Sequence, residues 1–340
     1  MSNEQRGKLP GKKKMSVPAM ILIDLLCIAA GLIVFAWFHH VRDAYFPSGT
    51  VHEEPVILIT PTPEITVTPT PEPEAAVPSE EPVREYSGMW GEKFADKFTD
   101  GEIIRTENSY ISENVNVMLT HVEQENLSYH VADIYVSDIK YLRSAFGQKG
   151  YGSRSLAADI AADNDAIVAI SGDYYSARLE GIVIRNGMLY RETRFQDVCI
   201  LLGDGRMITL ANKDVDLGQL REAAPWQVWS FGPMLLENGK AMTTFTSDVV
   251  RKNPRSAIGY AEPGHYYFVQ VDGRGGYGSR GMTMMELAEL FESLGCETAY
   301  NLDGGQTAGI VWHGELISFP YGRSVSDIIY ITDSPDDTEG

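Results

Sequence analysis

Short runs of apolar residues alternate with turn-forming residues from about residue 86 onward. Asn-Gly and Gly-Asp-Gly sequences between such runs are strong signals of β-hairpins, because these residues tolerate the positive φ that tight turns need. The pattern therefore predicts hairpin turns at Asn186-Gly187, Gly203-Asp204-Gly205 and Asn238-Gly239. The strands predicted beside these turns are 181–185, 188–190, 198–202, 207–210 and 233–237.

Apolar residues at helical spacing occur in two stretches. Thr283 and Glu286 have the spacing of a capping box, in which each side chain bonds to the backbone of the other residue, and the apolar residues that follow share one face. These signals predict one helix from Thr283 to Leu294 and another from Leu156 to Ala162 that is capped by Ser155.

Strands are predicted on both sides of the later helix, at His265–Val271 and Thr298–Leu302. Polar residues at the ends of such strands commonly form binding sites. Alternating apolar patches at 115–120 and 130–136 look like the strands that begin the domain. Together the patterns predict an α+β fold: a single domain with mixed sheets rich in antiparallel hairpins and a few helices.

Residues Val17 to Phe38 form an apolar run of roughly the twenty residues that a helix needs to cross a bilayer. Basic residues precede this run, and by the positive-inside rule they keep the N-terminus in the cytoplasm and place the rest of the chain outside. A cleaved signal peptide is the alternative, but its apolar core is shorter, about 7 to 15 residues. We therefore expect an uncleaved transmembrane anchor, in which Asp24 reaches toward the headgroups.

Proline recurs at nearly every second or third position from Ile59 to Val83, and such a segment behaves as an extended spacer. The predicted organisation is a cytoplasmic basic tail (1–16), a transmembrane anchor (17–38), a Pro/Thr/Glu-rich stalk (39–85), an extracytoplasmic domain (86–332) and an acidic tail (333–340).

The chain has 28 basic and 47 acidic residues, which gives a formal net charge of −19. This balance opposes binding to nucleic acid, so an anionic substrate needs a local cationic site. Of the three cysteines, Cys27 lies in the apolar run. Cys199 and Cys296 can form at most one disulfide, and the sequence does not say whether they pair.

Four polar clusters lie beside apolar strands. Each alone is typical of a turn, because Asp bonds nearby amides and Gly tolerates positive φ. Together they supply carboxylates for proton transfer or nucleophilic attack and guanidinium groups for phosphate oxygens. This combination suits the cleavage of a sugar phosphate. The clusters are Ser171–Tyr175, Asn253–Ser256, Asp272–Arg274 and Asn301–Thr307.

The order of these and neighbouring motifs resembles the phosphodiester glycosidase family over Ser153–Ile331. The resemblance implies hydrolysis of a glycosyl phosphodiester at the anomeric carbon, which gives a free sugar and a phosphomonoester. The motifs are S-G-D-Y-Y (171–175), G-I-V-I-R-N-G (181–187), S-F-G-P-M-L (230–235), N-P-R-S-A-I-G (253–259), V-D-G-R (271–274), M-T-M-M-E-L-A (282–288), N-L-D-G-G-Q-T (301–307) and R-S-V-S-D-I-I (323–329).

The resemblance also implies site residues at the matching positions. The candidate catalytic carboxylates are Asp303, Asp272 and Asp173, with Asp303 the first choice for a nucleophile or base. Arg255 and Arg274 are expected to hold the departing phosphate, and glycines let a substrate approach backbone amides. The other candidates for substrate contact are Asn301, Gly304, Gly305, Gln306, Thr307, Ser256 and Tyr175.

Ser171 stands where the family usually has Asn, and Gln306 stands where it usually has Gly. These departures favour an alternative, a non-catalytic module of the cell envelope that binds glycans or acts as a scaffold on the same fold. Asp272, Arg274 and Asp303 favour the enzyme. For an anchored, outward-facing domain, the expected substrate is a phosphodiester-linked envelope glycan.

The sequence leaves metal ligands unassigned. Its histidines lack the spacing of a zinc site, and it contains no G-x-S-x-G serine motif. The expected reaction requires no cofactor, while Ca²⁺ or Mg²⁺ stays open because clustered aspartates offer the oxygen ligands that these ions prefer. The aromatic residues that either stack on sugars or belong to the core are Tyr174, Tyr175, Tyr266, Tyr267, Trp226, Trp229 and Trp312.

Overall fold

The computed structural model describes residues 56–57 and 87–335 of the chain, which belong to one compact unit. The predicted basic tail, the transmembrane anchor, nearly all of the stalk and residues 336–340 lie outside the described residues. Within the described part, no helix is both long enough and apolar enough to span a bilayer.

The described part is built mainly from strands, with α-helices at α3 (Ala157–Asp163), α4 (Leu217–Glu222) and α5 (Met284–Ser293). The strands are β1 (Val56–Ile57), β2 (Ile104–Arg105), β3 (Ser109–Ile111), β4 (Val115–Gln124), β5 (Leu127–Val136), β6 (Leu142–Phe146), β7 (Val168–Ser171), β8 (Gly181–Arg185), β9 (Met188–Thr193), β10 (Val198–Leu201), β11 (Met207–Leu210), β12 (Gln227–Trp229), β13 (Leu236–Glu237), β14 (Lys240–Ala241), β15 (Arg255–Glu262), β16 (His265–Val271), β17 (Thr298–Asn301), β18 (Ile310–Trp312), β19 (Glu315–Leu316) and β20 (Asp327–Ile331).

The strands form three larger sheets and one two-stranded ribbon. Their orders are β1-β9-β8-β12-β10-β11, β17-β15-β16-β5-β4-β3-β2, β19-β18-β7-β20-β6 and β13-β14. Among the described residues every pair of neighbouring strands is antiparallel. The prediction of an α+β fold rich in antiparallel hairpins and with few helices is therefore confirmed for this part of the chain, whereas the predicted mixed sheets are wrong, because the described sheets are purely antiparallel.

The predicted hairpin turns are also confirmed. Asn186 and Gly187 join β8 to β9 with φ of 51° and 81°, and Asn238 and Gly239 join β13 to β14 with φ of 52° and 72°. Gly205 has a φ of 79° in the turn between β10 and β11. Positive φ at both central residues matches the right-handed twist of the flanking strands, which explains why Asn-Gly marks these turns.

Helix α5 begins as predicted, because Thr283 and Glu286 form a complete capping box. The predicted cap of α3 is wrong. Leu156 precedes this helix without a side-chain cap, whereas Ser155 pairs through its backbone with Val325 and its hydroxyl accepts from the amide of Gln148. Ser155 is therefore already engaged in the neighbouring strand connection.

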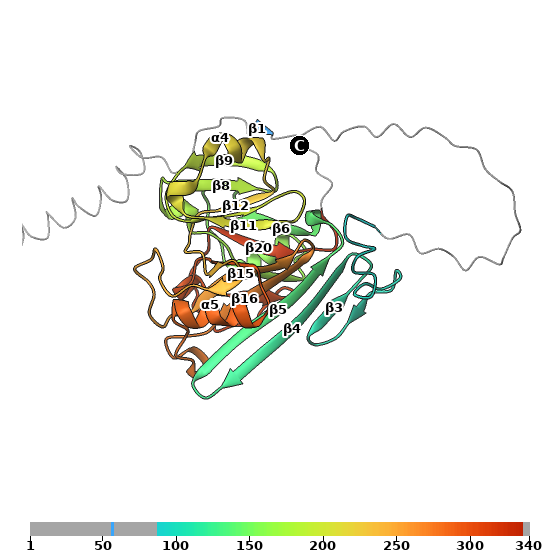
Figure 1. Ribbon diagram of the computed structural model, residues 1–340. Helices are drawn as coiled ribbons and strands as arrows, with labels where there is room; N and C mark the ends of the chain where they lie inside the picture. Colours follow the sequence, from blue (N-terminus) through green and yellow to red (C-terminus); the bar gives the residue numbers. More distant parts are fainter. Residues whose placement is uncertain (1–55, 58–86, 336–340) are drawn as a thin grey trace, which may run out of the picture. The chain divides into compact units, whose positions relative to one another are not determined.

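Helices cover the outer faces of sheets that share a common core. The largest cluster of buried side chains joins the sheet of β4, β5, β15 and β16 to the sheet of β7, β18 and β20. Helix α5 lies against β15 and β16 on the opposite face, where Leu287 and Phe291 pack with Val269 (Figure 1). Helix α3 covers the other sheet through Ile160, which packs with Val311.

The connection through α5 sets the position of the polar clusters. Strands β16 and β17 are both antiparallel to β15, which lies between them, so their C-terminal ends lie at the edge where β15 begins. Arg255 pairs with Val271, and Ala257 pairs with Asn301. Three of the four clusters therefore meet at one edge of this sheet.

Cys199 and Cys296 are both buried and both free. Cys199 lies on β10 and Cys296 follows α5, and they belong to different core clusters. Burial raises the pKa of Cys296 to about 12, so its thiol stays protonated. Cys199 and Cys296, whose pairing the sequence left open, therefore form no disulfide with each other.

Candidate active site

A pocket of about 390 Å³ opens at the sheet edge where the polar clusters meet. It is lined by Asn301 at the end of β17, by residues 302–306 after it, and by Arg255 at the start of β15. Residues 246–249, from the segment between β14 and β15, line another wall. A volume of this size is typical of small-molecule sites.

Backbone hydrogen bonds hold the loop after β17 in place. The amide of Asp303 donates to the carbonyl of Gly172 at 2.9 Å, and the amide of Gly305 donates to the carbonyl of Pro254 at 3.0 Å. A Cβ on Gly304 would lie 2.7 Å from the oxygen of Pro254, so only glycine allows this close approach. The D-G-G sequence thus fits the loop tightly between two neighbouring segments.

Asp303 is the buried carboxylate of this pocket. Its side chain lines the pocket, the residue is only 7% exposed, and its Oδ2 has no hydrogen-bond partner among the described residues. Burial raises its pKa to about 7, although the Thr307 side chain and the charge of Arg323 act in the opposite direction. A carboxyl group that titrates near neutral pH is suited to proton transfer or attack.

Arginines supply the positive charge that the acidic chain otherwise lacks. Among the described residues, four arginines line the pocket, whereas its acidic lining residues are Asp303 and Asp248. The arginines come from four separate segments and converge on the same space. They are Arg178, Arg255, Arg274 and Arg323.

Arg255, the predicted phosphate contact, is 3% exposed and partly engaged by the backbone. Its Nε donates to Met282 O at 3.1 Å, and its Nη2 donates to Val249 O at 2.9 Å. Burial, followed by the charge of Arg274, lowers its pKa to about 10, so it stays charged at neutral pH. Arg255 therefore fixes the wall of the pocket as well as contributing charge.

Arg274 is held over the glycine loop. Its Nη2 donates to Asn253 Oδ1 at 3.1 Å, and a Cβ on Gly305 would lie 3.2 Å from the same nitrogen. Its backbone has a φ of 54°, which is uncommon for a residue with a side chain. The loop of Asp272 to Arg274 therefore accepts an unfavourable backbone angle where it directs a guanidinium group toward the D-G-G loop.

Further polar atoms at this pocket are also unpaired. Asn301 Oδ1 and Arg178 Nε are buried and lack a hydrogen-bond partner within the described part of the chain, although Asn301 Nδ2 and Arg178 Nη2 are both bonded. Buried polar atoms in folded proteins are nearly always paired. Three such atoms lie around one pocket, counting Asp303 Oδ2, and each can bond to a ligand or to water there.

Asp272, a predicted catalytic residue, does not line the pocket. It is fully buried, and its Oδ1 accepts from Gln270 Nε2 and from the amide of Phe319, both at 3.0 Å. Its Oδ2 accepts from Ser128 Oγ at 3.1 Å. These contacts use the carboxylate to hold the segment around Phe319, and they give Asp272 a supporting position instead of a place beside the substrate.

Asp173 likewise lies behind the pocket wall. Its Oδ1 accepts from Arg178 Nη2 at 2.6 Å, and its Oδ2 accepts from the amide of Ser230 at 2.8 Å. Its side chain is fully buried and does not line the pocket. Asp173 therefore positions Arg178, whose Nε is one of the unpaired atoms.

The remaining predicted contacts divide into two groups. Gly304, Gly305 and Gln306 line the pocket, as Asn301 does. Ser256, Thr307 and Tyr175 are buried and are not among its lining residues. Thr307 Oγ1 donates to Gly304 O at 2.6 Å, and Ser256 Oγ lies 2.7 Å from the buried hydroxyl of Ser171, which also lies 2.8 Å from Asp303 O. Ser256 and Thr307 therefore hold the loop of Asp303 from behind, whereas the prediction of Tyr175 as a substrate contact is wrong, because its ring packs with Phe146 and Tyr151.

Several lining residues were not found from the sequence. Arg178, Phe195 and Phe231 form one wall, where the Arg178 guanidinium lies 4.7 Å from the ring of Phe195 and 5.9 Å from that of Phe231. Arg323 donates to the hydroxyl of Tyr174 at another side. Phe231 lies in the motif S-F-G-P-M-L and Arg323 in the motif R-S-V-S-D-I-I, both of which contribute to the family resemblance. These two motifs are the sequence signal that could have identified both residues.

The described residues contain no group of three or more His, Cys, Asp or Glu side chains that is arranged to hold a metal ion. In the described part of the chain the aromatic candidates do not line the pocket, although Tyr174 accepts a hydrogen bond from the lining residue Arg323. Tyr266 and Trp229 are core residues, Trp226 Nε1 donates to Leu142 O, and Trp312 Nε1 donates to Glu107 O. Among the described residues, the pocket is thus lined by four arginines, by Asp303 and Asp248, and by the rings of Phe195 and Phe231.

The chain is similar to known proteins in sequence and in fold. An uncharacterized SPbeta prophage-derived protein of Bacillus subtilis (strain 168), YomE, is 30% identical over 203 residues, which cover 56% of this chain and 31% of YomE. The chain therefore spans about a third of the length of that relative.

Among solved structures, the catalytic domain of zebrafish N-acetylglucosamine-1-phosphodiester alpha-N-acetylglucosaminidase, auto-inhibited by its pro-peptide, matches with a TM-score of 0.52. The sequences are 22% identical, and the match covers 64% of this chain and 83% of that one. At this identity the likeness shows a shared fold. The family model for phosphodiester glycosidase matches residues 164–332, within which most of the pocket residues fall. Over residues 164–332 the chain therefore belongs to the phosphodiester glycosidase family.

Proposed function

We propose that the chain is a glycosidase that hydrolyses the anomeric bond of a sugar-1-phosphodiester, with Asp303 as its reacting carboxylate. The observation that carries the proposal is the position of Asp303: a buried carboxyl group with a pKa of about 7 and an unpaired oxygen, in a pocket where four of the described arginines meet. Guanidinium groups recognise phosphate oxygens, and the carboxylate supplies the attack on the sugar.

Each displacement at the anomeric carbon breaks one bond and forms one. Ionised Asp303 either takes a proton from the water that attacks this carbon, or attacks the carbon itself to form a glycosyl ester, which water then hydrolyses to release the sugar and regenerate the carboxylate. The bond from the anomeric carbon to the phosphate oxygen breaks, and its electron pair leaves with the phosphomonoester. Because that product is a stable anion held by arginines, the departing oxygen needs little help from a general acid.

The arginines have separable tasks in this proposal. Arg274 and Arg323 are exposed, and they donate to the side chains of Asn253 and Tyr174, bonds that a phosphate can replace. Arg178 and Arg255 are instead anchored by Asp173 and by backbone carbonyls. Anchored guanidinium groups fix a phosphate with little loss of side-chain entropy. The unpaired Asn301 Oδ1 accepts from a sugar hydroxyl.

The direct test incubates the full chain with a panel of methyl phosphodiesters of different sugar-1-phosphates. Release of free sugar and methyl phosphate in equal amounts is the expected result. The Asp303→Asn variant is the matched control, since its side chain has nearly the same shape. Equal release by the variant would reject the assignment of Asp303. Tight glycan binding without release from any member of the panel would instead support the non-catalytic module.

The family departure at Ser171 carries less weight for that alternative than the sequence suggested. Ser171 is fully buried and does not line the pocket, so its hydroxyl replaces a supporting group and not a substrate contact. Gln306 does line the pocket, and its exposed side chain is free to contact the phosphate or the sugar.

We further propose that residues 17–38 anchor the chain in the cell membrane, with the domain outside and an envelope glycan as substrate. The support is in the sequence: the apolar run, the basic residues before it and the proline-rich segment after it. Fractionation of cells with a tagged chain, followed by protease treatment of intact cells, tests this topology. Recovery of the tagged domain in the cytosol would reject it.

A further inference from the structure

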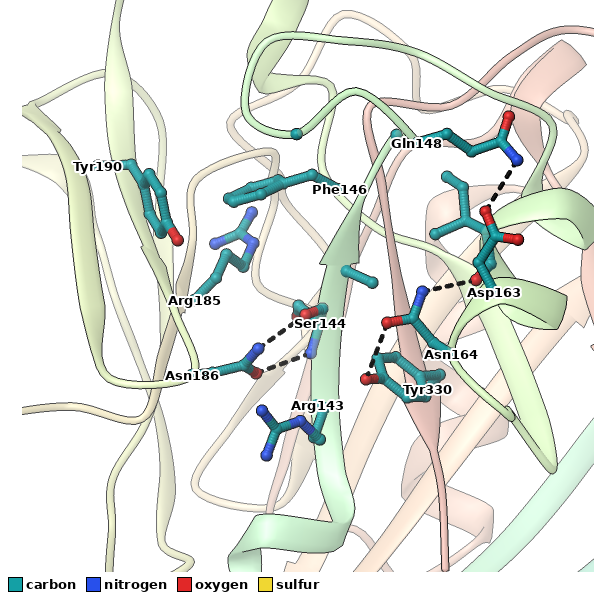
Figure 2. Close-up of a pocket in the computed structure, with 14 residues that line it drawn as sticks. Arg143, Ser144, Phe146, Gln148, Asp163, Asn164, Arg185, Asn186, Tyr190 and Tyr330 are labelled. Carbon is teal, nitrogen blue, oxygen red and sulfur yellow. Dashed lines mark hydrogen bonds between the residues drawn. The ribbon is translucent and has the colours of Figure 1, made fainter. Parts of the chain in front are cut away.

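A second pocket, of about 370 Å³, lies between β6 and the β8–β9 hairpin (Figure 2). Its lining comes from Ser144 and Phe146 of β6, from Arg185 of β8 and from Tyr190 of β9, and the end of α3 contributes Asn164. In the described part of the chain, this lining shares no residue with that of the candidate active site. The proposed reaction uses none of these side chains.

One side of this pocket is aromatic. The rings of Phe146 and Tyr190 lie 4.8 Å apart at 84°, and Tyr151 stacks behind Tyr190 with 5.2 Å between the centroids. Phe146 and Tyr190 are both partly exposed and line the cavity. Partly exposed aromatic rings, supported from behind by other rings, provide a rigid apolar surface for the C–H face of a sugar.

Buried polar groups give the pocket hydrogen-bonding atoms in addition to its aromatic side. Arg185 is 2% exposed; its Nε lies 2.7 Å from Asp327 Oδ2, and its Nη1 donates to backbone carbonyls. Its Nη2 has no hydrogen-bond partner among the described residues and lies 3.8 Å from Asp173 Oδ2. Figure 2 shows this guanidinium group directed toward the side of the pocket that Phe146 and Tyr190 form.

Ser144 provides a second unpaired group. Its Oγ is buried and has no hydrogen-bond partner within the described residues, although its backbone is fixed by two hydrogen bonds with the side chain of Asn186. Buried polar atoms are nearly always paired with protein or with water, so these two atoms of residues that line one cavity are available to a ligand that displaces water. A donor from Arg185 and a hydroxyl from Ser144 match the hydroxyl groups of a sugar.

The positive and negative charges around the second pocket balance, which favours an uncharged ligand. Arg143 and Arg185 line it together with Asp163, and Asp327 pairs directly with Arg185, so these charges balance. The candidate active site, in contrast, has four arginines and two aspartates among the described lining residues. We propose that the second pocket is a separate carbohydrate site, which binds an uncharged pyranose between the Phe146–Tyr190 wall and the Arg185 and Ser144 groups.

The two pockets adjoin the same buried ion pairs. Asp173 Oδ1 lies 2.6 Å from Nη2 of Arg178, which lines the first pocket. Asp173 Oδ2 lies 3.8 Å from Nη2 of Arg185, which lines the second pocket. A second sugar contact on a domain that cleaves polymers would add avidity for the polymer. That consequence rests on the proposed function, whereas the binding of sugar itself does not.

The test is photoaffinity labelling of the full chain with an uncharged methyl N-acetylglucosaminide that carries a diazirine, followed by peptide mapping. Saturable labelling of the peptides around Phe146 and Tyr190, prevented by excess unlabelled methyl N-acetylglucosaminide but not by inorganic phosphate, is the expected result. Labelling confined to residues 301–306, or prevented equally well by phosphate, would overturn the proposal. Absence of saturable labelling would also overturn it.

Matched variants separate this site from the first. Tyr190→Ala should weaken sugar binding about tenfold, while Tyr190→Phe keeps the ring and should bind like the wild type. Ser144→Ala removes only an unpaired hydroxyl and should weaken binding without lowering the melting temperature. Asp303→Asn should leave labelling of the second pocket unchanged, even where sugar release is lost. Unchanged binding in both Tyr190→Ala and Ser144→Ala would reject the site.

Discussion

The backbone amide of Asp303 donates a hydrogen bond to the carbonyl of Gly172, with 2.9 Å between nitrogen and oxygen. This bond joins the loop after β17 in one sheet to the end of β7 in another sheet. It fixes the Asp303 backbone from behind, while its side chain lines the pocket with one oxygen unpaired among the described residues. The position and the desolvation of this carboxyl group are therefore both set by the fold.

Asp303→Asn should reduce sugar release from a sugar-1-phosphodiester by about 10³-fold, because an amide neither attacks carbon nor accepts a proton from water. The backbone hydrogen bond to Gly172 does not involve the side chain, so the variant should fold normally. Steady-state kinetics and circular dichroism on the same preparation measure both properties. A variant that turns over like the wild type would remove Asp303 from the mechanism.

The stability of the protein should depend on pH through Asp303. Its pKa of about 7 in the folded state is above the value of about 3.9 in an unfolded chain, so the folded state binds more protons between these values. Stability should therefore fall as the pH rises from about 4 to about 7, by up to about 4 kcal/mol from this group.

Asp303→Asn isolates this effect, because Asp327 also has a raised pKa, about 6, and contributes with the same sign. The variant should match the wild type near pH 4 and exceed its free energy of unfolding above pH 7. Urea denaturation at several pH values measures the difference. Equal stability of the two proteins at pH 8 would show that the carboxylate is not desolvated.

Arg323→Ala should weaken substrate binding and shift the pH dependence of the rate. Arg323 is exposed, lines the pocket and lowers the pKa of Asp303 by its charge. Its loss should raise KM about tenfold and move the midpoint of kcat/KM, which rises with pH as Asp303 ionises, to higher pH. The melting temperature should stay nearly constant.

Arg255→Ala is the contrasting variant, because the Arg255 guanidinium donates to the carbonyls of Met282 and Val249. It should lower both stability and activity, whereas Arg323→Ala lowers activity alone. A kcat/KM profile with the same midpoint in Arg323→Ala and wild type would show that Arg323 does not act on the ionisation of Asp303.

Asp272→Ala should destabilise the fold by about 3 kcal/mol or more, since it leaves the donors of Ser128, Gln270 and Phe319 buried without an acceptor. Asp272→Asn keeps one acceptor oxygen and should cost less. Denaturant titration gives the stability, and activity per folded molecule gives the functional effect. Full stability with lost activity in Asp272→Asn would restore Asp272 as a catalytic candidate.

The parts of the fold that the sequence predicted are those with local causes. Asn186-Gly187 has the positive φ of its turn, and Thr283 caps α5 through a residue three positions away. Ser155 has a good local signal too, but its pairing with Val325 comes from a distant segment. Local patterns therefore predict turns and caps well until a long-range contact competes for the same group.

The sequence likewise predicted only those parts of the candidate site that have a local signal. The D-G-G sequence marks a loop in any context, and Asp303 lies in the pocket. The side chain of Asp272 turns instead toward partners on β5 and on the segment before β20, which no local pattern reveals. Arg178 and Phe195 reach the pocket from segments with no motif of their own, so only the tertiary structure identifies them.

Gly304→Ala tests whether the tight fit of the D-G-G loop matters for catalysis. The new Cβ would lie 2.7 Å from Pro254 O, so either the loop or the start of β15 must shift. Because reacting groups must be held within a fraction of an ångström, a shift of this kind should lower kcat about 10²-fold with a smaller change in KM. Gly203→Ala is the matched control. Gly203 lies in the turn between β10 and β11, and a Cβ added there would meet no atom within 4 Å. If both variants retain wild-type kcat, the close approach of the loop to Pro254 is a packing feature with no part in the reaction.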